Sequence, residues 1–100
     1  MAKYELTRKA VTDLSEIWDY TVKNWSENQA DRYYRLLTES IKEIVKNPDS
    51  GKDYQEIAEG LKGFKTGQHI IFYISEERKN IRIIRILHNR MDLKKRIEEK

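Results

Sequence analysis

The sequence predicts an α+β domain in which a hairpin of two helices covers one face of a mainly antiparallel sheet. Apolar residues recur at steps of three and four through the first half of the chain, which is the period of an amphipathic helix. In the second half they form short continuous or alternating runs, which are typical of strands. A length of 100 residues suits one domain, so the predicted order β-αα-βββ should occupy residues 1–100.

A short strand and a long helix are expected at the N-terminus. Residues 3–7 alternate polar and apolar side chains, as a half-buried strand does. Thr7 then offers a side-chain oxygen to the free backbone amides of a helix start. The apolar positions that follow share one helical stripe and predict a helix over about residues 8–25: Ala10, Leu14, Ile17, Trp18, Thr21, Val22 and Trp25.

A second helix follows with almost no loop. Ser26 and Gln29 have the spacing of a capping box, which ends one helix and begins the next. Pro48 and Gly51 stop the second helix, because proline removes a backbone donor and glycine admits positive φ. Over about residues 8–46 the two helices should therefore form an antiparallel hairpin. The second apolar stripe consists of Ala30, Tyr33, Tyr34, Leu37, Ile41, Ile44 and Val45.

Three strands joined by short turns are predicted over about residues 61–88. They correspond to residues 61–65, 68–74 and 81–88. The middle strand is a continuous apolar run, which suits a central strand that is buried on both faces. Short connections make an antiparallel meander. The helices should bury their stripes against one face of this sheet and leave the other face to solvent or to a partner.

Composition argues against several classes of protein. There are no cysteines, so disulfides and thiolate metal sites are excluded. Around His69 and His88 no spacing of acids forms a recognisable ligand set, and no nucleophile or phosphate-loop motif appears. We therefore expect no metal, no cofactor and no hydrolase chemistry. The N-terminus lacks a signal-peptide run and no segment approaches ~20 apolar residues, so we expect a cytoplasmic protein that does not enter a membrane.

Positive charge is concentrated at the C-terminal end of the chain. The net charge is only +3, which does not by itself indicate nucleic-acid binding. Residues 81–100 nevertheless hold seven basic and three acidic side chains, whereas residues 49–60 hold one basic and four acidic ones. Residues 89–100 are expected to form a short charged helix or tail.

Arg85 lies within an otherwise apolar strand, where a charge needs a partner or open solvent. Alternate side chains of a strand share a face. This places Ile84, Ile86 and His88 on one face, and Ile83, Arg85 and Leu87 on the other. Two interpretations of Arg85 remain open. It is either part of an internal salt bridge that pins the C-terminus, with Asp13, Glu16 or Asp92 as its partner, or it contacts a target.

Large aromatic side chains gather on the predicted helix hairpin. They are Trp18, Trp25, Tyr33 and Tyr34. Packing in the core accounts for most of them. A domain of this size cannot cover every large ring, however, so one or two should line a groove that accepts a partner segment.

Two C-terminal blocks are the most specific features of the chain. They are Gly67-Gln68-His69-Ile70-Ile71-Phe72-Tyr73 and Arg85-Ile86-Leu87-His88-Asn89-Arg90-Met91-Asp92. Weaker features accompany them on the helices and in the loops: Asp13-Leu14, Ile17-Trp18, Trp25, Gln29-Ala30 with Tyr33, Asn47-Pro48 with Gly51, and Gly60-Leu61. Together these residues resemble the ParE toxins of the RelE/ParE superfamily, over about Tyr4 to Asp92.

The resemblance implies the β-αα-βββ fold and a function that composition does not reveal. It implies the toxin of a type II toxin–antitoxin system, which inhibits DNA gyrase by protein contact and not by catalysis. It also implies a cognate ParD-like antitoxin with a ribbon-helix-helix domain, a higher-order hetero-oligomer of the two proteins, and contact with operator DNA only through the antitoxin. The candidates for target contact are Arg85, His88, Arg90, Met91 and Asp92. The candidates for antitoxin binding are Leu14, Trp18 and Tyr33.

Two alternatives to a gyrase inhibitor remain. The superfamily also contains ribosome-dependent mRNA endonucleases of the RelE and YoeB type, which use basic residues with a general acid or base on the open sheet face. This chain carries Ile70 where the nucleases tend to carry arginine, and Asn89 at their C-terminal tyrosine position. His88 alone then lacks a stabiliser for developing phosphate charge. The other alternative is a non-toxic relic that still binds an antitoxin.

Overall fold

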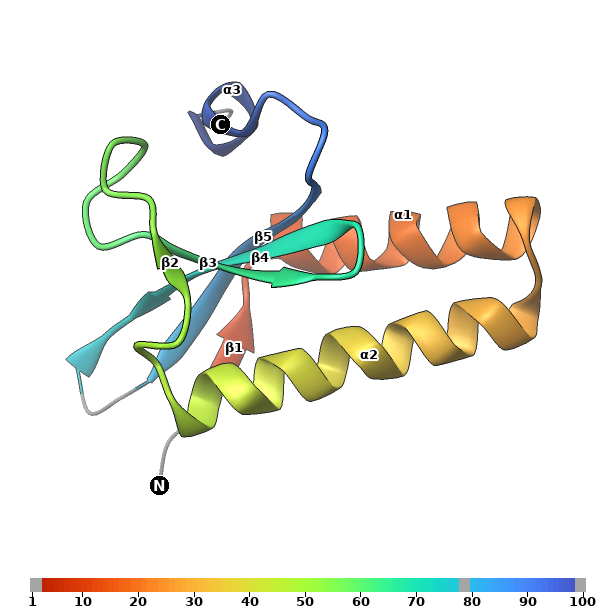
Figure 1. Cartoon of the computed structure of the whole chain (residues 1–100), viewed down its shortest axis with the longest axis horizontal. Coiled ribbons are helices and arrows are strands. Elements are labelled where there is room, and N and C mark those ends of the chain that lie inside the picture. Colours follow the sequence, from red (N-terminus) through yellow and green to blue (C-terminus); the bar gives the residue numbers. More distant parts are fainter. Residues whose placement is uncertain (1–2, 78–79, 99–100) are drawn as a thin grey trace.

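In the computed structural model, which describes residues 3–77 and 80–98, a five-stranded sheet packs against a hairpin of two long helices (Figure 1). The elements in chain order are β1 (Tyr4–Leu6), α1 (Arg8–Asn24), α2 (Glu27–Lys46), β2 (Lys52–Asp53), β3 (Lys62–Thr66), β4 (His69–Ser75), β5 (Ile81–His88) and α3 (Leu93–Glu98). The predicted α+β class and the helix hairpin are confirmed. The two-residue strand β2 has no signal in the sequence pattern.

Both long helices begin at the predicted side-chain caps. Thr7 Oγ1 accepts a hydrogen bond from the Ala10 amide at 3.1 Å, and Ser26 Oγ accepts one from the Gln29 amide at 3.0 Å. Each cap satisfies a backbone donor that the first helical turn leaves without a partner, which contributes about 1 kcal/mol. The two caps therefore fix where the helices start and how tightly the hairpin turns.

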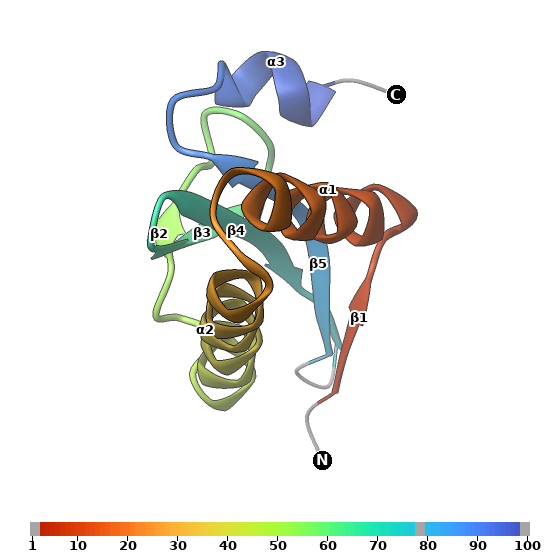
Figure 2. The same cartoon turned by 90° about the vertical axis from the view of Figure 1, so that its right-hand side faces the viewer.

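The sheet has the order β1-β5-β4-β3-β2. The pairs β3–β4 and β4–β5 are antiparallel, which confirms the predicted meander, and β2 adds to β3 at one edge. At the other edge β1 pairs with β5 in parallel. A parallel pair needs a long crossover connection, and the helix hairpin lies within the connection between these two strands. In both views α2 and α3 lie on opposite sides of the sheet (Figures 1 and 2).

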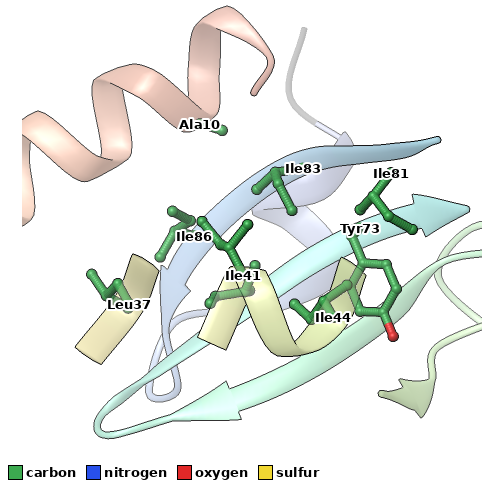
Figure 3. Close-up of a cluster of buried hydrophobic side chains, with 9 residues drawn as sticks. Ala10, Leu37, Ile41, Ile44, Tyr73, Ile81, Ile83 and Ile86 are labelled. Carbon is green, nitrogen blue, oxygen red and sulfur yellow. The ribbon is translucent and has the colours of Figure 1, made fainter. Parts of the chain in front are cut away.

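The larger core lies between the helix hairpin and one face of the sheet (Figure 3). Its buried side chains are Ala10, Leu37, Ile41, Ile44, Ile71, Tyr73, Ile81, Ile83 and Ile86. The Tyr73 hydroxyl at the edge of this core donates to the Pro48 carbonyl at 2.7 Å and accepts from the Gly51 amide at 3.0 Å. These two bonds fasten the loop after α2 to the sheet. Glycine at position 51 permits this close approach, because a Cβ there would lie 2.6 Å from the Tyr73 hydroxyl.

The second face of the sheet is also covered, so the expectation that it would be left to solvent or to a partner is wrong. Leu61, Ile70, Phe72 and Leu87 are buried there beneath residues 54–58 and α3. Side chains that pack over this cluster include Tyr54, Ile57, Leu93 and Ile97. The continuous apolar run of β4 places large side chains on both faces, and a chain of this size covers the second face with its own loop and last helix.

A bulge in β5 changes which side chains share a face. The register places Phe72 opposite Arg85 and Tyr73 opposite Ile83, so Ile84 is the extra residue. Ile83 consequently packs in the larger core with Ile86, while Ile84 joins Leu87 on the second face. The strict alternation predicted for this strand is therefore wrong at Ile83 and Ile84, because an extra residue reverses the facing of the side chains before it.

Candidate partner-binding sites

Arg85 lies in an internal network that ties three elements together. Its Nε donates to Asp13 Oδ2 at 2.8 Å and its Nη2 donates to Asp13 Oδ1 at 2.9 Å. The two side chains are only 13% and 8% exposed. Of the three acids considered from the sequence, Asp13 on α1 is thus the partner, as the internal salt-bridge interpretation predicted. Asp13 Oδ2 also accepts the Ile86 backbone amide at 3.0 Å, so the buried carboxylate is satisfied on both oxygens.

The same guanidinium reaches the C-terminal helix. Arg85 Nη1 donates to the Arg96 carbonyl at 3.0 Å, which joins β5 to α3. Leu93 and Ile97 of α3 pack on the second face of the sheet. Arg85 therefore connects α1, β5 and α3, and it acts on the C-terminal segment from inside the molecule.

A row of three aromatic side chains leads from α2 to the end of β5. The Tyr33 hydroxyl lies 2.6 Å from His69 Nδ1 and accepts the Gln68 amide at 3.0 Å. The ring of His69 meets the ring of His88 edge-on, with 5.3 Å between the ring centroids. His88 Nδ1 in turn accepts the Arg90 amide at 3.1 Å. The row thus connects the helix hairpin to the turn that follows β5.

Burial favours the neutral forms of His69 and Tyr33. Burial, with a smaller contribution from the neighbouring His88, lowers the pKa of His69 from 6.5 to about 4. Burial also raises the pKa of Tyr33. At neutral pH His69 is therefore uncharged and Tyr33 protonated, so the tyrosine hydroxyl can donate to His69 Nδ1. These groups hold the turn in place through hydrogen bonds and ring packing.

An exposed turn follows β5 and contains three of the five predicted target-contact residues. Arg90, Met91 and Asp92 are all exposed in this turn. Met91 donates its amide to the His88 carbonyl at 3.1 Å, and Asp92 Oδ1 accepts the Lys95 amide at 3.2 Å at the start of α3. His88 is half-buried at the base of the turn, and Arg85 lies inside the domain. The structure therefore gathers the five candidates into one region but gives them different exposure.

A shallow depression between α1 and α2 contains two of the three predicted antitoxin-binding residues. Leu14 and Trp18 line it together with Tyr34 and Ala30. The rings of Trp18 and Tyr34 meet edge-on with centroids 6.1 Å apart, and the two residues are 36% and 42% exposed. Tyr33 does not line this depression. Tyr34 does, and its spacing from Ala30 and Leu37, at four and three residues, was the signal in the sequence that could have identified it.

Apolar surface continues beyond this depression along α1. Val11 lies seven residues before Trp18 and so shares its side of α1, and Trp25 follows at the C-cap of the helix. Both are exposed, Trp25 to 73%. A run of apolar side chains that a small domain leaves uncovered is typical of a protein-binding surface.

Metal and membrane sites find no support in the described part of the chain. Within residues 3–77 and 80–98, no group of three or more His, Asp or Glu side chains is arranged to hold a metal ion. No helix in these ranges is long and apolar enough to cross a membrane.

Comparisons with known proteins agree with this architecture. Residues 4–93 match a family described as the ParE toxin of the type II toxin–antitoxin system parDE. Toxin ParE1 of Mycobacterium tuberculosis (strain ATCC 25618 / H37Rv) is 36% identical over 92 residues, which cover 92% of this chain and 94% of that toxin. Toxin ParE of Escherichia coli is 30% identical over 100 residues, covering 100% of this chain and 97% of that toxin. A solved structure of the chromosomal ParDE system from P. aeruginosa has a TM-score of 0.73 at 22% identity, and the match covers 88% of this chain and 95% of that one.

Proposed function

Because the chain belongs to the ParE toxin family of type II toxin–antitoxin systems, we propose that it inhibits DNA gyrase by protein contact and that a cognate antitoxin neutralises it. The proposal places its action in the cytoplasm and requires no catalysis. The structural observation that supports it most directly is the exposed turn after β5, which the Arg85 network and the histidine row hold from within.

The proposed gyrase-binding surface consists of Arg90, Met91 and Asp92 with the exposed lysines of α3, Lys94 and Lys95. Methionine and arginine are enriched in protein interfaces, because they offer contact area and donors together. Under this proposal Arg85 and His88 position the surface: Arg85 holds α3, and His88 accepts the amide of Arg90. Side chains that are fixed before binding lose less conformational entropy on association, which favours affinity.

The proposed antitoxin-binding surface is the depression of Leu14, Trp18 and Tyr34, extended along α1 by Val11 and Trp25. An amphipathic helix from a ParD-like, ribbon-helix-helix antitoxin would bury its apolar face there. Tyr33 of α2 supports this surface because its hydrogen bonds to His69 and Gln68 hold the helix against the turn between β3 and β4. Operator DNA would be bound only by the antitoxin, within a larger hetero-oligomer.

A ribosome-dependent mRNA endonuclease is the second candidate. The observation that favours it is the edge-on contact between the His69 and His88 rings. Against it, one nitrogen of each ring is already engaged, by the Tyr33 hydroxyl and by the Arg90 amide. A general acid or base must reach the reacting group with the nitrogen that transfers the proton, and the engaged nitrogen of each ring does not do so while these hydrogen bonds persist.

An assay with purified gyrase separates the two candidates. The chain should cause linear, protein-linked DNA to accumulate from a supercoiled plasmid, and adding the antitoxin should reverse this effect. RNA should remain intact when the chain is added to translating ribosomes. Cleaved mRNA with unaffected gyrase would reject the proposal in favour of the nuclease.

A further inference from the structure

A cavity of about 530 Å³ opens on the second face of the sheet, and its lining includes Asn89, which precedes Arg90 of the proposed gyrase-binding surface. Its lining includes Lys52 and Tyr54, Gly63 and Lys65 of β3, and Asn89. Its volume falls within the range of about 300–1,000 Å³ that is usual for small-molecule sites. The loop and the helix that cover the rest of this face leave the cavity open.

The strand register explains why two lysines converge on the cavity. Lys52 pairs with Gly63, and Lys65 pairs with Ile70, whose side chain belongs to the second-face cluster. Gly63 and Lys65 are two residues apart on one strand and so share this face. Since Gly63 has no side chain, the Tyr54 ring and the Ile70 side chain approach the strand closely at this position. A Cβ at Gly63 would lie 2.6 Å from the Tyr54 ring, so the cavity depends on glycine at this position.

Two lysines and no acidic side chain are among the described residues that line the cavity. Lys52 and Lys65 are both exposed, and neither forms an ion pair with a carboxylate of the described residues. The Lys52 ammonium lies 5.4 Å from the centre of the Tyr54 ring, and that ring packs edge-on against Phe72. Two lysines at a concave surface, without an ion-pair partner in the part of the chain that the structure describes, attract an anionic group.

Asn89 adds a requirement that a simple anion does not meet. Its Oδ1 is buried without a hydrogen-bond partner among the residues that the structure describes. Its backbone is fixed, because the Asn89 amide donates to the Gln68 carbonyl at 2.9 Å. An unsatisfied buried oxygen is costly. A ligand that carries an N–H donor as well as a negative charge would satisfy the asparagine and the lysines together.

We propose that this cavity binds a nucleotide. Lys52 and Lys65, with the Ser50 hydroxyl, hold the phosphate, and the Asn89 carboxamide accepts an N–H group of the base. Tyr54 supplies an aromatic wall, which is a common partner of nucleobases. The nucleotide is either a free mononucleotide or the 5′-phosphorylated end of a single strand, because both present the same chemical groups.

The experiment is a titration of the isotopically labelled full chain, followed by NMR, with the four deoxynucleoside 5′-monophosphates. Inorganic phosphate and a 5′-phosphorylated tetranucleotide are titrated in parallel. The expected result is a set of shifts confined to residues 50–54, 63–65 and 89. A tetranucleotide that binds more tightly than every mononucleotide assigns the site to strand ends, and equal affinity assigns it to free nucleotides.

Substitutions test the individual contacts. Lys65→Gln should weaken binding at least tenfold and reduce its salt dependence. Asn89→Leu keeps the approximate size of the side chain but removes the acceptor for the base, and it should weaken nucleotide binding at least tenfold while leaving the binding of inorganic phosphate unchanged. Lys42→Gln, which removes the same charge from the exposed face of α2, should leave the affinity unchanged. Thermal unfolding of each variant shows that the fold is retained.

Three results would overturn the proposal. They are the absence of shifts at millimolar nucleotide, equal binding of inorganic phosphate alone, and displacement of a bound nucleotide by an acidic peptide at lower concentration. No gyrase or antitoxin is present in this titration. Its failure therefore leaves the proposed toxin function untouched, and failure of the toxin function leaves the nucleotide site untouched.

Discussion

Replacing Asp13 with asparagine should destabilise the domain by about 3 kcal/mol. The buried carboxylate accepts two hydrogen bonds from Arg85 and one from the Ile86 amide. Removing one partner of a buried ion pair costs roughly 3–5 kcal/mol, because the remaining charge is left uncompensated. Asparagine keeps the shape and one acceptor, which places the cost at the lower end of that range. For a domain of about 100 residues, 1 kcal/mol shifts Tm by roughly 4–8 °C, so Tm should fall by at least about 12 °C.

The matched control is Asp19→Asn, which removes the same charge from an exposed position on the same helix. It should change stability by no more than about 0.5 kcal/mol. Thermal unfolding followed by circular dichroism measures both variants. Equal Tm values for the two variants would refute the assignment of Asp13 and Arg85 as a stabilising buried pair.

A double substitution separates stability from positioning. With Asp13→Leu and Arg85→Met, an apolar pair replaces the ion pair, and such replacements are often neutral or stabilising. The double variant should recover much of the stability, but it cannot supply the hydrogen bond from Arg85 to the Arg96 carbonyl. Hydrogen exchange should therefore remain faster than in the unsubstituted chain at the amides of α3. Unchanged protection there would show that Arg85 does not hold the helix.

Three further predictions concern pH, antitoxin binding and a tight contact. The pKa of His69 is lowered from 6.5 to about 4, so the folded state favours the neutral ring, and this contribution to stability is complete above about pH 6.5 and declines as pH falls towards 4. Urea unfolding at both pH values should show the decline, and it should be smaller in His69→Gln, which lacks the titrating ring. Trp18→Ala should weaken antitoxin binding, measured by calorimetry, at least tenfold, whereas Leu36→Ala should not, because Leu36 is an exposed apolar residue outside the depression. Equal losses of affinity in the two variants would place the antitoxin-binding surface outside the depression. Gly51→Ala should lower Tm, because its Cβ would lie 2.6 Å from the Tyr73 hydroxyl, and an unchanged Tm would show that the loop moves aside easily.

Local sequence signals predicted the helices and the strand meander well. Thr7 and Ser26 cap the helices where the sequence placed them, because a cap depends on a side chain and an amide three residues away. The meander followed from short connections between β-rich runs. These features depend on neighbours in the chain, which is why a single sequence reveals them.

Features that depend on distant partners were harder to predict. The bulge that exchanges the faces of Ile83 and Ile84 arises from the register with β4, which alternation within one strand does not show. The covering of the second face depends on how Leu93 and Ile97 fold back over the sheet. The separation of Tyr33 from the depression follows from its hydrogen bond to His69, 36 residues away. Candidate residues could thus be named from the sequence, but their exposure and grouping required the fold.

The most direct test of the central claim is gyrase-mediated DNA cleavage with a variant that changes only the exposed turn. Arg90→Glu combined with Met91→Asp reverses one charge and replaces an apolar side chain with a second negative charge. Both side chains are exposed, so the fold should be retained. We expect this variant to lose accumulation of cleaved DNA while still binding the antitoxin. Lys42→Glu, on the exposed face of α2, should retain both activities. Full gyrase inhibition by the turn variant would contradict the account and place the target-binding surface elsewhere.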